Sequence, residues 1–137
     1  MEKDIDKLCE NGDWYGPTGD ELVKSIESIL NVTLPADYRY FILKYGSGSK
    51  SGLEISGYHP NFFSDLNILG KTVYELRDYY FYPQDYLFIS DTGDGGQICL
   101  DRSDWTVHEV YQDRPKGITD KKVAENFLDF IRMYFIE

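Results

Sequence analysis

The segment from Asp85 to Asp113 constrains the fold of this chain more than any other. It contains three short runs rich in aliphatic, β-branched and aromatic residues, at 87–89, 98–100 and 107–111. Turn-forming residues separate the runs, namely Asp, Thr and Gly at 91–96 and Arg, Ser and Asp at 102–104. Short runs bounded by Asp and Gly are typical of strands joined by hairpins. The segment therefore predicts a three-stranded antiparallel meander at the centre of the fold.

The same segment is strongly acidic, because it carries seven Asp and Glu residues and one Arg. Four of these carboxylates fall in or beside the predicted turns: Asp91, Asp94, Asp101 and Asp104. We therefore expect an acidic rim on the sheet. The whole chain has a formal net charge of −10, which disfavours binding to nucleic acid or to an anionic membrane. The charge is compatible with a basic partner or simply with high solubility.

A chain of 137 residues with 42% hydrophobic residues is expected to form one domain with its own core. Its two cysteines, Cys9 and Cys99, have neither a metal-binding nor a redox spacing. Cys99 lies in an apolar run, so we expect a buried thiol. The N-terminal residues contain no apolar signal segment, and no apolar run approaches the roughly 20 residues of a membrane helix. These features predict a cytoplasmic protein.

Two amphipathic helices are predicted before the sheet. Thr18 and Glu21 have the spacing of a capping box, which would begin the first helix. One helical face of it would then carry the apolar residues Leu22, Ile26, Ile29 and Leu30. Pro35 suits the first position of a second helix, and its buried face would carry Tyr38, Phe41, Ile42 and Tyr45. Residues 1–13 show no clear pattern, although Ile5 and Leu8 fit a short helix.

The rest of the chain predicts further elements around the meander. Residues 46–52 are rich in Gly and Ser and predict a loop, and Leu53–Ile55 predicts the first strand. A third helix is expected over 71–80, with Val73, Leu76 and Tyr80 buried. A last helix is expected to begin at Thr119 or Asp120 and to bury the stripe Val123, Phe127, Phe130, Ile131 and Tyr134. Together these elements predict a single α+β domain over 1–137, mainly antiparallel sheet with an N-terminal helix pair, a middle helix and a C-terminal helix packed on it.

Several short motifs occur in a distinctive order: Leu34-Pro35-Ala36-Asp37-Tyr38, Phe41-Ile42, Tyr45-Gly46, the turn at 91–98 and Val110-Tyr111. In this order and spacing, over about residues 14–135, they resemble the SUKH superfamily. That superfamily includes a yeast cell-wall-assembly regulator and many bacterial immunity proteins. Two turns depart from its usual pattern. Residues 46–48 are Gly-Ser-Gly in place of Asn-Gly-Gly, and two glycines follow Asp94 instead of preceding it.

The sequence predicts no catalytic residue, metal or cofactor. Asp91 and Asp94 invite comparison with a calcium loop, but the twelfth position counted from Asp91 is Arg102, where an EF-hand needs an acid. A carboxylate pair could serve glycoside hydrolysis, but no acid lies in an evident apolar pocket. The glycines at 93–96 lack the Lys and Ser/Thr of a phosphate-binding loop. His59 and His108 have no paired nucleophile, and an enzymatic role would gain support only from a deep pocket that places one of them beside a carboxylate.

The resemblance implies a non-enzymatic intracellular binding protein. In the immunity branch it would neutralise a cognate polymorphic toxin, a nuclease or deaminase, and a basic toxin surface would suit the acidic rim. The expected contact residues are the carboxylates and aromatic anchors Asp91, Asp94, Asp101, Asp104, Trp105, Tyr58 and Tyr82. Trp105 could equally cap the open end of the core. The alternative is an intracellular regulatory or scaffold protein of the cell-wall-assembly-regulator type. The sequence indicates neither the toxin nor an oligomeric state.

Overall fold

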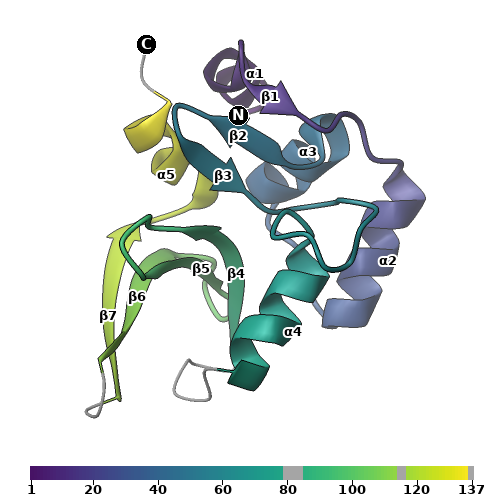
Figure 1. Cartoon of the computed structure of the whole chain (residues 1–137). Coiled ribbons are helices and arrows are strands. Elements are labelled where there is room, and N and C mark those ends of the chain that lie inside the picture. Colours follow the sequence, from purple (N-terminus) through teal and green to yellow (C-terminus); the bar gives the residue numbers. More distant parts are fainter. Residues whose placement is uncertain (79–84, 114–116, 136–137) are drawn as a thin grey trace.

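The computed structural model describes residues 1–78, 85–113 and 117–135 (Figure 1). Within these ranges the chain forms five helices and two antiparallel sheets, which confirms the predicted α+β class. The elements are, in order, α1 (Glu2–Cys9), β1 (Asp13–Trp14), α2 (Asp20–Leu30), α3 (Ala36–Tyr45), β2 (Gly48–Lys50), β3 (Leu53–Ile55), α4 (Ile68–Asp78), β4 (Tyr86–Asp91), β5 (Gln97–Asp101), β6 (Val107–Asp113), β7 (Gly117–Ala124) and α5 (Phe127–Tyr134). None of the helices in the described ranges is long and apolar enough to cross a membrane.

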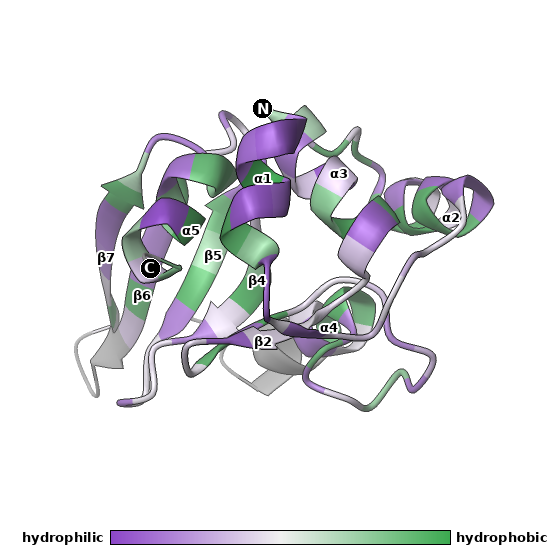
Figure 2. Cartoon of the chain, turned by 90° about the horizontal axis from the view of Figure 1, so that it is seen from above, coloured by the Kyte–Doolittle hydropathy of each residue, from purple (hydrophilic) through white to green (hydrophobic). Residues whose placement is uncertain are grey.

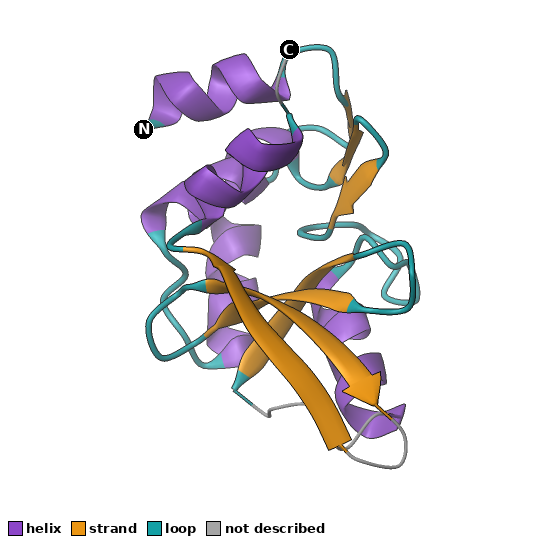
Figure 3. Ribbon diagram, turned by 90° about the vertical axis from the view of Figure 1, so that its left-hand side faces the viewer, coloured by secondary structure: helices purple, strands orange, loops and turns teal. Residues whose placement is uncertain are grey.

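The larger sheet is a meander in which β4, β5, β6 and β7 are neighbours in that order. Its first three strands are the three that the Asp85–Asp113 segment predicts. The smaller sheet has the order β1-β2-β3. The two sheets meet where the backbone N–H of Ser56 donates to the carbonyl of Ile89, at 2.7 Å. Figure 3 shows the strong twist of the larger sheet and the helices arranged above and behind it.

The main core lies between one face of the larger sheet and the helices. From the sheet it receives Leu87, Ile89, Ile98 and Leu100, all fully buried. Figure 2 shows α1 and α5 in front of β4 and β5, which are largely hydrophobic, with α3 beside α1. The helices and β1 contribute a cluster of aromatic rings, in which Trp14 of β1 lies edge-on to Phe41 of α3 at 5.3 Å between ring centroids. Because side chains alternate along a strand, Tyr86 and Phe88 face the other side, where they form a smaller cluster with Cys99 and Val110.

Helix α1 is tied to α3 by polar contacts around Asp6. Its carboxylate accepts hydrogen bonds from the hydroxyl groups of Tyr40 and Tyr45, at 2.9 and 2.6 Å, and pairs with Lys44 at 2.8 Å. Ile5 on the same helix is fully buried in the main core. The N-terminal segment, which shows no clear sequence pattern, is therefore an integrated part of the fold.

The predicted capping box is wrong, and the predicted face of α2 is partly wrong. Gly19 precedes the helix without a side-chain cap, and the Thr18 hydroxyl has no hydrogen-bond partner within the described part of the chain. The buried face is Val23, Ile26 and Leu30, whereas Leu22 and Ile29 are 44% and 68% exposed. Both stripes have helical spacing, so packing against α3 decides between them. In α3, the predicted Tyr38, Phe41 and Ile42 are buried, whereas Tyr45 is only partly buried. Pro35 is the N-cap and not, as predicted, the first residue of the helix.

Two predictions about strands are also wrong. Residues 48–50, expected in a loop, form β2, which pairs with both β1 and β3, so Leu53–Ile55 is the third strand and not the first. The expected start of the last helix at Thr119 or Asp120 instead lies in β7, which pairs with β6 from Gly117 to Ala124. The helix α5 begins only at Phe127, where the side chain of Asn126 accepts a hydrogen bond from the N–H of Asp129. It buries Phe127, Phe130 and Ile131 as predicted, but Tyr134 is 38% exposed.

The middle helix is α4, which begins three residues before the expected range of 71–80. Val73, predicted to be buried, is 56% exposed. Tyr80 lies outside the described residues. The early start of the helix places Lys71 and Thr72 on its buried side, at 5% and 3% exposure, and the Thr72 hydroxyl accepts a hydrogen bond from the N–H of Phe88 in β4.

Candidate functional site

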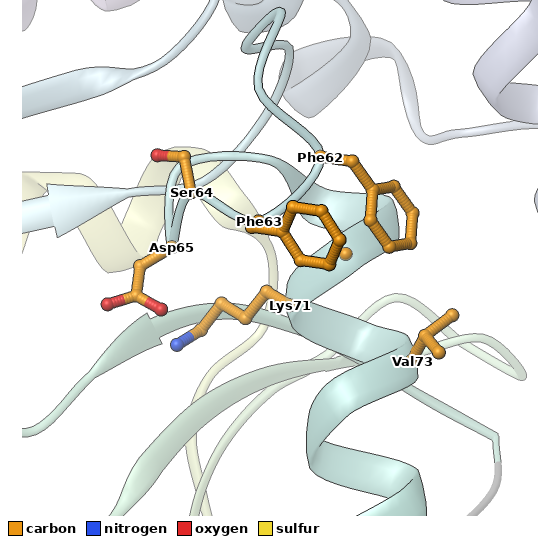
Figure 4. Close-up of a pocket in the computed structure, with 7 residues that line it drawn as sticks. Phe62, Phe63, Ser64, Asp65, Lys71 and Val73 are labelled. Carbon is orange, nitrogen blue, oxygen red and sulfur yellow. The ribbon is translucent and has the colours of Figure 1, made fainter.

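Two consecutive phenylalanines project from the loop between β3 and α4 (Figure 4). Phe63 is 90% exposed and Phe62 is 46% exposed. Their rings lie edge to face, with centroids 5.5 Å apart. Together with the exposed Val73 they form one side of a shallow pocket of about 320 Å³. We call this the Phe62–Phe63 pocket, and its lining residues are Phe62, Phe63, Ser64, Asp65, Gly70, Lys71 and Val73.

Asn67 fixes the end of the loop that carries the two phenylalanines. Its side-chain oxygen accepts hydrogen bonds from the N–H groups of Leu69 and Gly70, at 3.0 and 3.1 Å, so it caps the first turn of α4. Its side-chain amide donates to the carbonyl of His59 at 2.7 Å. One buried side chain therefore joins both ends of the loop.

Backbone contacts close the loop further. Gly57 donates to the carbonyl of Leu66 at 2.8 Å and accepts from the N–H of Ile68 at 2.9 Å. The Ser56 hydroxyl donates to the carbonyl of Asp65. The helix also approaches the loop closely at Gly70, where an added Cβ would lie 1.7 Å from the carbonyl oxygen of Phe62. These contacts hold the two phenylalanines in place on the surface.

An acidic groove adjoins the pocket, because Asp65 lines both. The groove has a volume of about 420 Å³ and is lined by Ser51, Gly52, Leu53, Glu54, Asp65, Asp91, Thr92, Gly93 and Tyr134. Lys71 lies at its boundary, with Nζ 3.1 Å from Asp91 Oδ1 and a side chain that is 3% exposed. In Figure 4 the Asp65 and Lys71 side chains extend away from the two phenyl rings. In addition to Asp91, which pairs with Lys71, the groove therefore contains two further carboxylates, those of Glu54 and Asp65.

The structure does not bring the four predicted carboxylates together into one rim. Asp91 and Asp94 lie at the β4–β5 hairpin, whereas Asp101 and Asp104 lie at the β5–β6 hairpin. In the antiparallel register Asp91 pairs with Gln97 and Asp101 pairs with Tyr86, so the two pairs stand at opposite ends of the sheet. Of the four, only Asp91 lines the acidic groove.

The remaining carboxylates have local roles in the turns. Asp94 accepts hydrogen bonds from the hydroxyl groups of Thr92 and Tyr111, which lower its pKa. Asp104 accepts from the hydroxyl and the N–H of Thr106, and these bonds likewise lower its pKa. Asp101 accepts from the N–H and the hydroxyl of Ser103. The bonds from the N–H groups of Ser103 and Thr106 are typical of Asx turns, and Asp94 links its turn to Tyr111 in β6. Local structure therefore accounts for these three residues without a binding partner.

The three predicted aromatic anchors have different positions. Trp105 has a φ of 61° and is half-buried against the main core, which favours the core-capping alternative. Tyr58 is half-buried, and its ring lies edge-on to that of the exposed Tyr15, with centroids 5.7 Å apart. Tyr82 lies outside the described residues. The exposed aromatic pair at 62–63 was missed, and the sequence signal beside it is the set of turn-forming residues on either side, Pro60-Asn61 and Ser64-Asp65, which indicates a loop.

His108 lies beside a carboxylate, and both nitrogens of its ring are within hydrogen-bonding distance of other side chains of the protein. Nδ1 is 2.7 Å from Asp120 Oδ1, and Nε2 is 2.7 Å from the Thr106 hydroxyl. The Tyr86 hydroxyl also donates to Asp120, and burial together with this bond raises the pKa of Tyr86. A carboxylate–histidine–hydroxyl series is also the order of a nucleophilic triad, so the surroundings of His108 and not its two partners decide its role. His108 lines neither the Phe62–Phe63 pocket nor the acidic groove.

His59 and the residue types that bind metal ions are the remaining candidates for a reactive site within the described ranges. His59 Nδ1 accepts a hydrogen bond from the N–H of Asn61 at 3.1 Å, and no ion pair within those ranges joins this histidine to a carboxylate. No group of three or more His, Cys, Asp or Glu side chains in the part of the chain that is described is arranged to hold a metal ion.

Comparison with known families agrees with the motif order in the sequence. The family model SUKH_6, described as SMI1-KNR4 cell-wall, matches residues 20–131. This match covers most of the chain, so the chain belongs to this family and hence to the SUKH superfamily. The matched segment contains every residue of the Phe62–Phe63 pocket.

Proposed function

We propose that this chain is a non-enzymatic binding protein that neutralises a cognate toxin by direct contact, as an immunity protein does. The observation that carries the proposal is the pair of exposed phenylalanines, held on a well-bonded loop beside an acidic groove. Exposed apolar clusters with a polar surround mark protein interaction sites. Family membership supports a binding role of this kind.

The charge of the chain supports a basic partner. Toxins that act on nucleic acids need basic surfaces to hold phosphates. A protein with a net charge of −10 would attract such a surface and associate with it faster. The same charge argues against nucleic acid or an anionic membrane as the direct partner. Neutralisation takes place in this proposal inside the cell that carries the toxin, in the cytoplasm.

A regulatory or scaffold role is the second candidate. The observation in its favour is the description of the matching family, which refers to the cell wall. In that case the same surface would bind a component of a regulatory complex, and no toxin would be involved.

A pull-down followed by a survival assay separates the two candidates. The tagged full chain is incubated with lysate of the source organism, washed in low and then in high salt, and the retained proteins are identified by mass spectrometry. Each toxin-like protein recovered is then expressed in a bacterial host with and without this chain. Immunity predicts recovery of a basic nuclease or deaminase domain and survival only when the chain is co-expressed. Recovery of a housekeeping complex, with no toxin suppressed, would overturn immunity in favour of the regulatory role.

A further inference from the structure

Among the described residues, the Phe62–Phe63 pocket gathers exposed apolar side chains from the loop after β3 and from α4. Phe62, Phe63 and Val73 are three of the exposed large hydrophobic residues, and all three line the same pocket. By contrast, Ile29 is 68% exposed on α2 and lines none of this surface. Aromatic residues clustered in this way are the usual anchors of protein interfaces.

Contacts within the protein itself restrain the backbone of the loop. Three contacts restrain it: the cap formed by Asn67, the two backbone hydrogen bonds of Gly57, and the close approach of Gly70 to Phe62. A preformed surface loses little conformational entropy on binding. The two rings therefore present a ready surface to an apolar side chain.

The charges around the pocket favour a positively charged group on the partner. Asp65 lines both the pocket and the groove, and Glu54 lies in the groove beside it. The positive charge of Lys71 is directed to Asp91. The two remaining carboxylates would attract a cation that lies next to the apolar anchor. A second copy of this chain fits poorly, because it would bring together two molecules that each have a formal net charge of −10.

We propose that the Phe62–Phe63 pocket docks a segment of the partner protein in which an aliphatic or aromatic side chain stands next to a lysine or arginine. The apolar side chain lies against Phe63, Phe62 and Val73, and the basic group reaches Asp65 and Glu54. The proposal rests on the proposed binding function and names the chemistry that the site recognises.

A library of random 12-residue peptides displayed on phage provides a test with a defined probe. The full chain is immobilised, and enriched peptides are synthesised with a fluorescent label and titrated by fluorescence anisotropy. The enriched sequences should combine an aromatic or large aliphatic residue with an adjacent Lys or Arg. Loss of an interface anchor typically weakens binding about 30-fold or more, so Phe63→Ser should have an effect of that size.

Matched variants separate the site from general effects on the protein. Ile29→Ser removes another exposed apolar side chain, on α2, and should leave the affinity unchanged. Asp65→Lys should weaken binding. Glu10→Lys makes the same charge change on an exposed residue at the end of α1, and it should weaken binding only through a long-range effect that added salt removes. Circular dichroism of each variant shows whether it is folded.

The outcomes are distinguishable from those of the survival assay. No enrichment, enrichment of acidic peptides, or binding that is insensitive to Phe63→Ser would overturn the docking proposal, even if a toxin is neutralised. Peptide binding at this site without any neutralised toxin would retain the docking site and overturn immunity. A toxin whose suppression survives Phe63→Ser and Asp65→Lys would place the functional contact elsewhere.

Discussion

Replacing Asn67 by alanine should destabilise the protein and loosen the loop that carries Phe62 and Phe63. The substitution removes an N-cap with two hydrogen bonds to α4, which costs about 1 kcal/mol. It also removes the amide that donates to the carbonyl of His59, and such a bond contributes about 1 kcal/mol more. For a chain of this length, a loss of about 2 kcal/mol lowers Tm by roughly 6–8 °C.

Two further variants separate the cap from the bond across the loop. Asn67→Ser keeps a capping oxygen but is too short to reach His59, so it should recover about half of the loss. Asn126→Ala removes the cap of α5, which has a single side-chain bond to Asp129, and should cost only about 1 kcal/mol. Thermal unfolding followed by circular dichroism measures the stability, and peptide binding by anisotropy measures the state of the pocket.

The reasoning would be refuted if Asn67→Ala and Asn126→Ala lowered Tm equally and Asn67→Ser restored the whole difference. Asn67 would then act as a cap alone, and the loop would be held by other contacts. Equal peptide affinity for the wild type and Asn67→Ala would also show that Asn67 does not preorganise the pocket.

Three other measurements test the description of the fold. Gly70→Ala should lower Tm although alanine usually stabilises a helix by about 1 kcal/mol, because its Cβ would lie 1.7 Å from the carbonyl oxygen of Phe62; a raised Tm would mean that the loop yields easily. Burial opposes a low pKa of Asp6, but the hydrogen bonds from Lys44 and two tyrosine hydroxyls lower it. A carboxyl whose pKa is lowered on folding contributes stability above its unfolded pKa of about 4 and loses it as the pH falls through the folded pKa. The difference in urea midpoint between wild type and Asp6→Asn should therefore be largest at neutral pH and shrink as the pH falls through the folded pKa of Asp6, and a difference that grows on acidification would contradict this. Burial raises the pKa of the Cys9 thiol to about 12, so a thiol reagent at neutral pH should label Cys9 only after unfolding, and rapid labelling of the native protein would show that the site opens.

Helices with strong apolar periodicity were predictable from the sequence alone. In α3 the spacing of Tyr38, Phe41 and Ile42 identifies the face that the structure buries. In α5, Phe127, Phe130 and Ile131 do the same. In α2 two overlapping stripes share Ile26 and Leu30, and local spacing does not distinguish them because both follow the period of a helix.

The strand β7 was not predictable from local composition. Its residues include Asp, Lys, Val and Ala, which are compatible with the start of the helix that follows. Pairing with β6 over seven residue pairs, from Val107–Ala124 to Asp113–Gly117, overrides this preference. The stability of a strand depends on its neighbours more than on the propensities of its own residues. Tertiary structure therefore decides that residues 117–124 form a strand.

The candidate site shows the same division. The sequence identified the acidic residues around the hairpins but not their separation, since the antiparallel register puts Asp91 opposite Gln97, the first residue of β5, whereas Asp101 is the last residue of that strand. Nor did it identify Phe62 and Phe63, because hydrophobic residues are expected inside until the structure shows them exposed.

By itself, the sequence determined the α+β class, the central meander from β4 to β6, the buried stripes of α3 and α5, and the family, because these follow from local spacing and motif order. Only the tertiary structure decided the face of α2, the strand β7, the separation of the carboxylates and the exposure of the phenylalanines. Each of these depends on contacts between residues that are distant in sequence. A surface assembled in this way, such as the pocket shared by the loop after β3 and the first turns of α4, has no linear pattern from which it could be predicted.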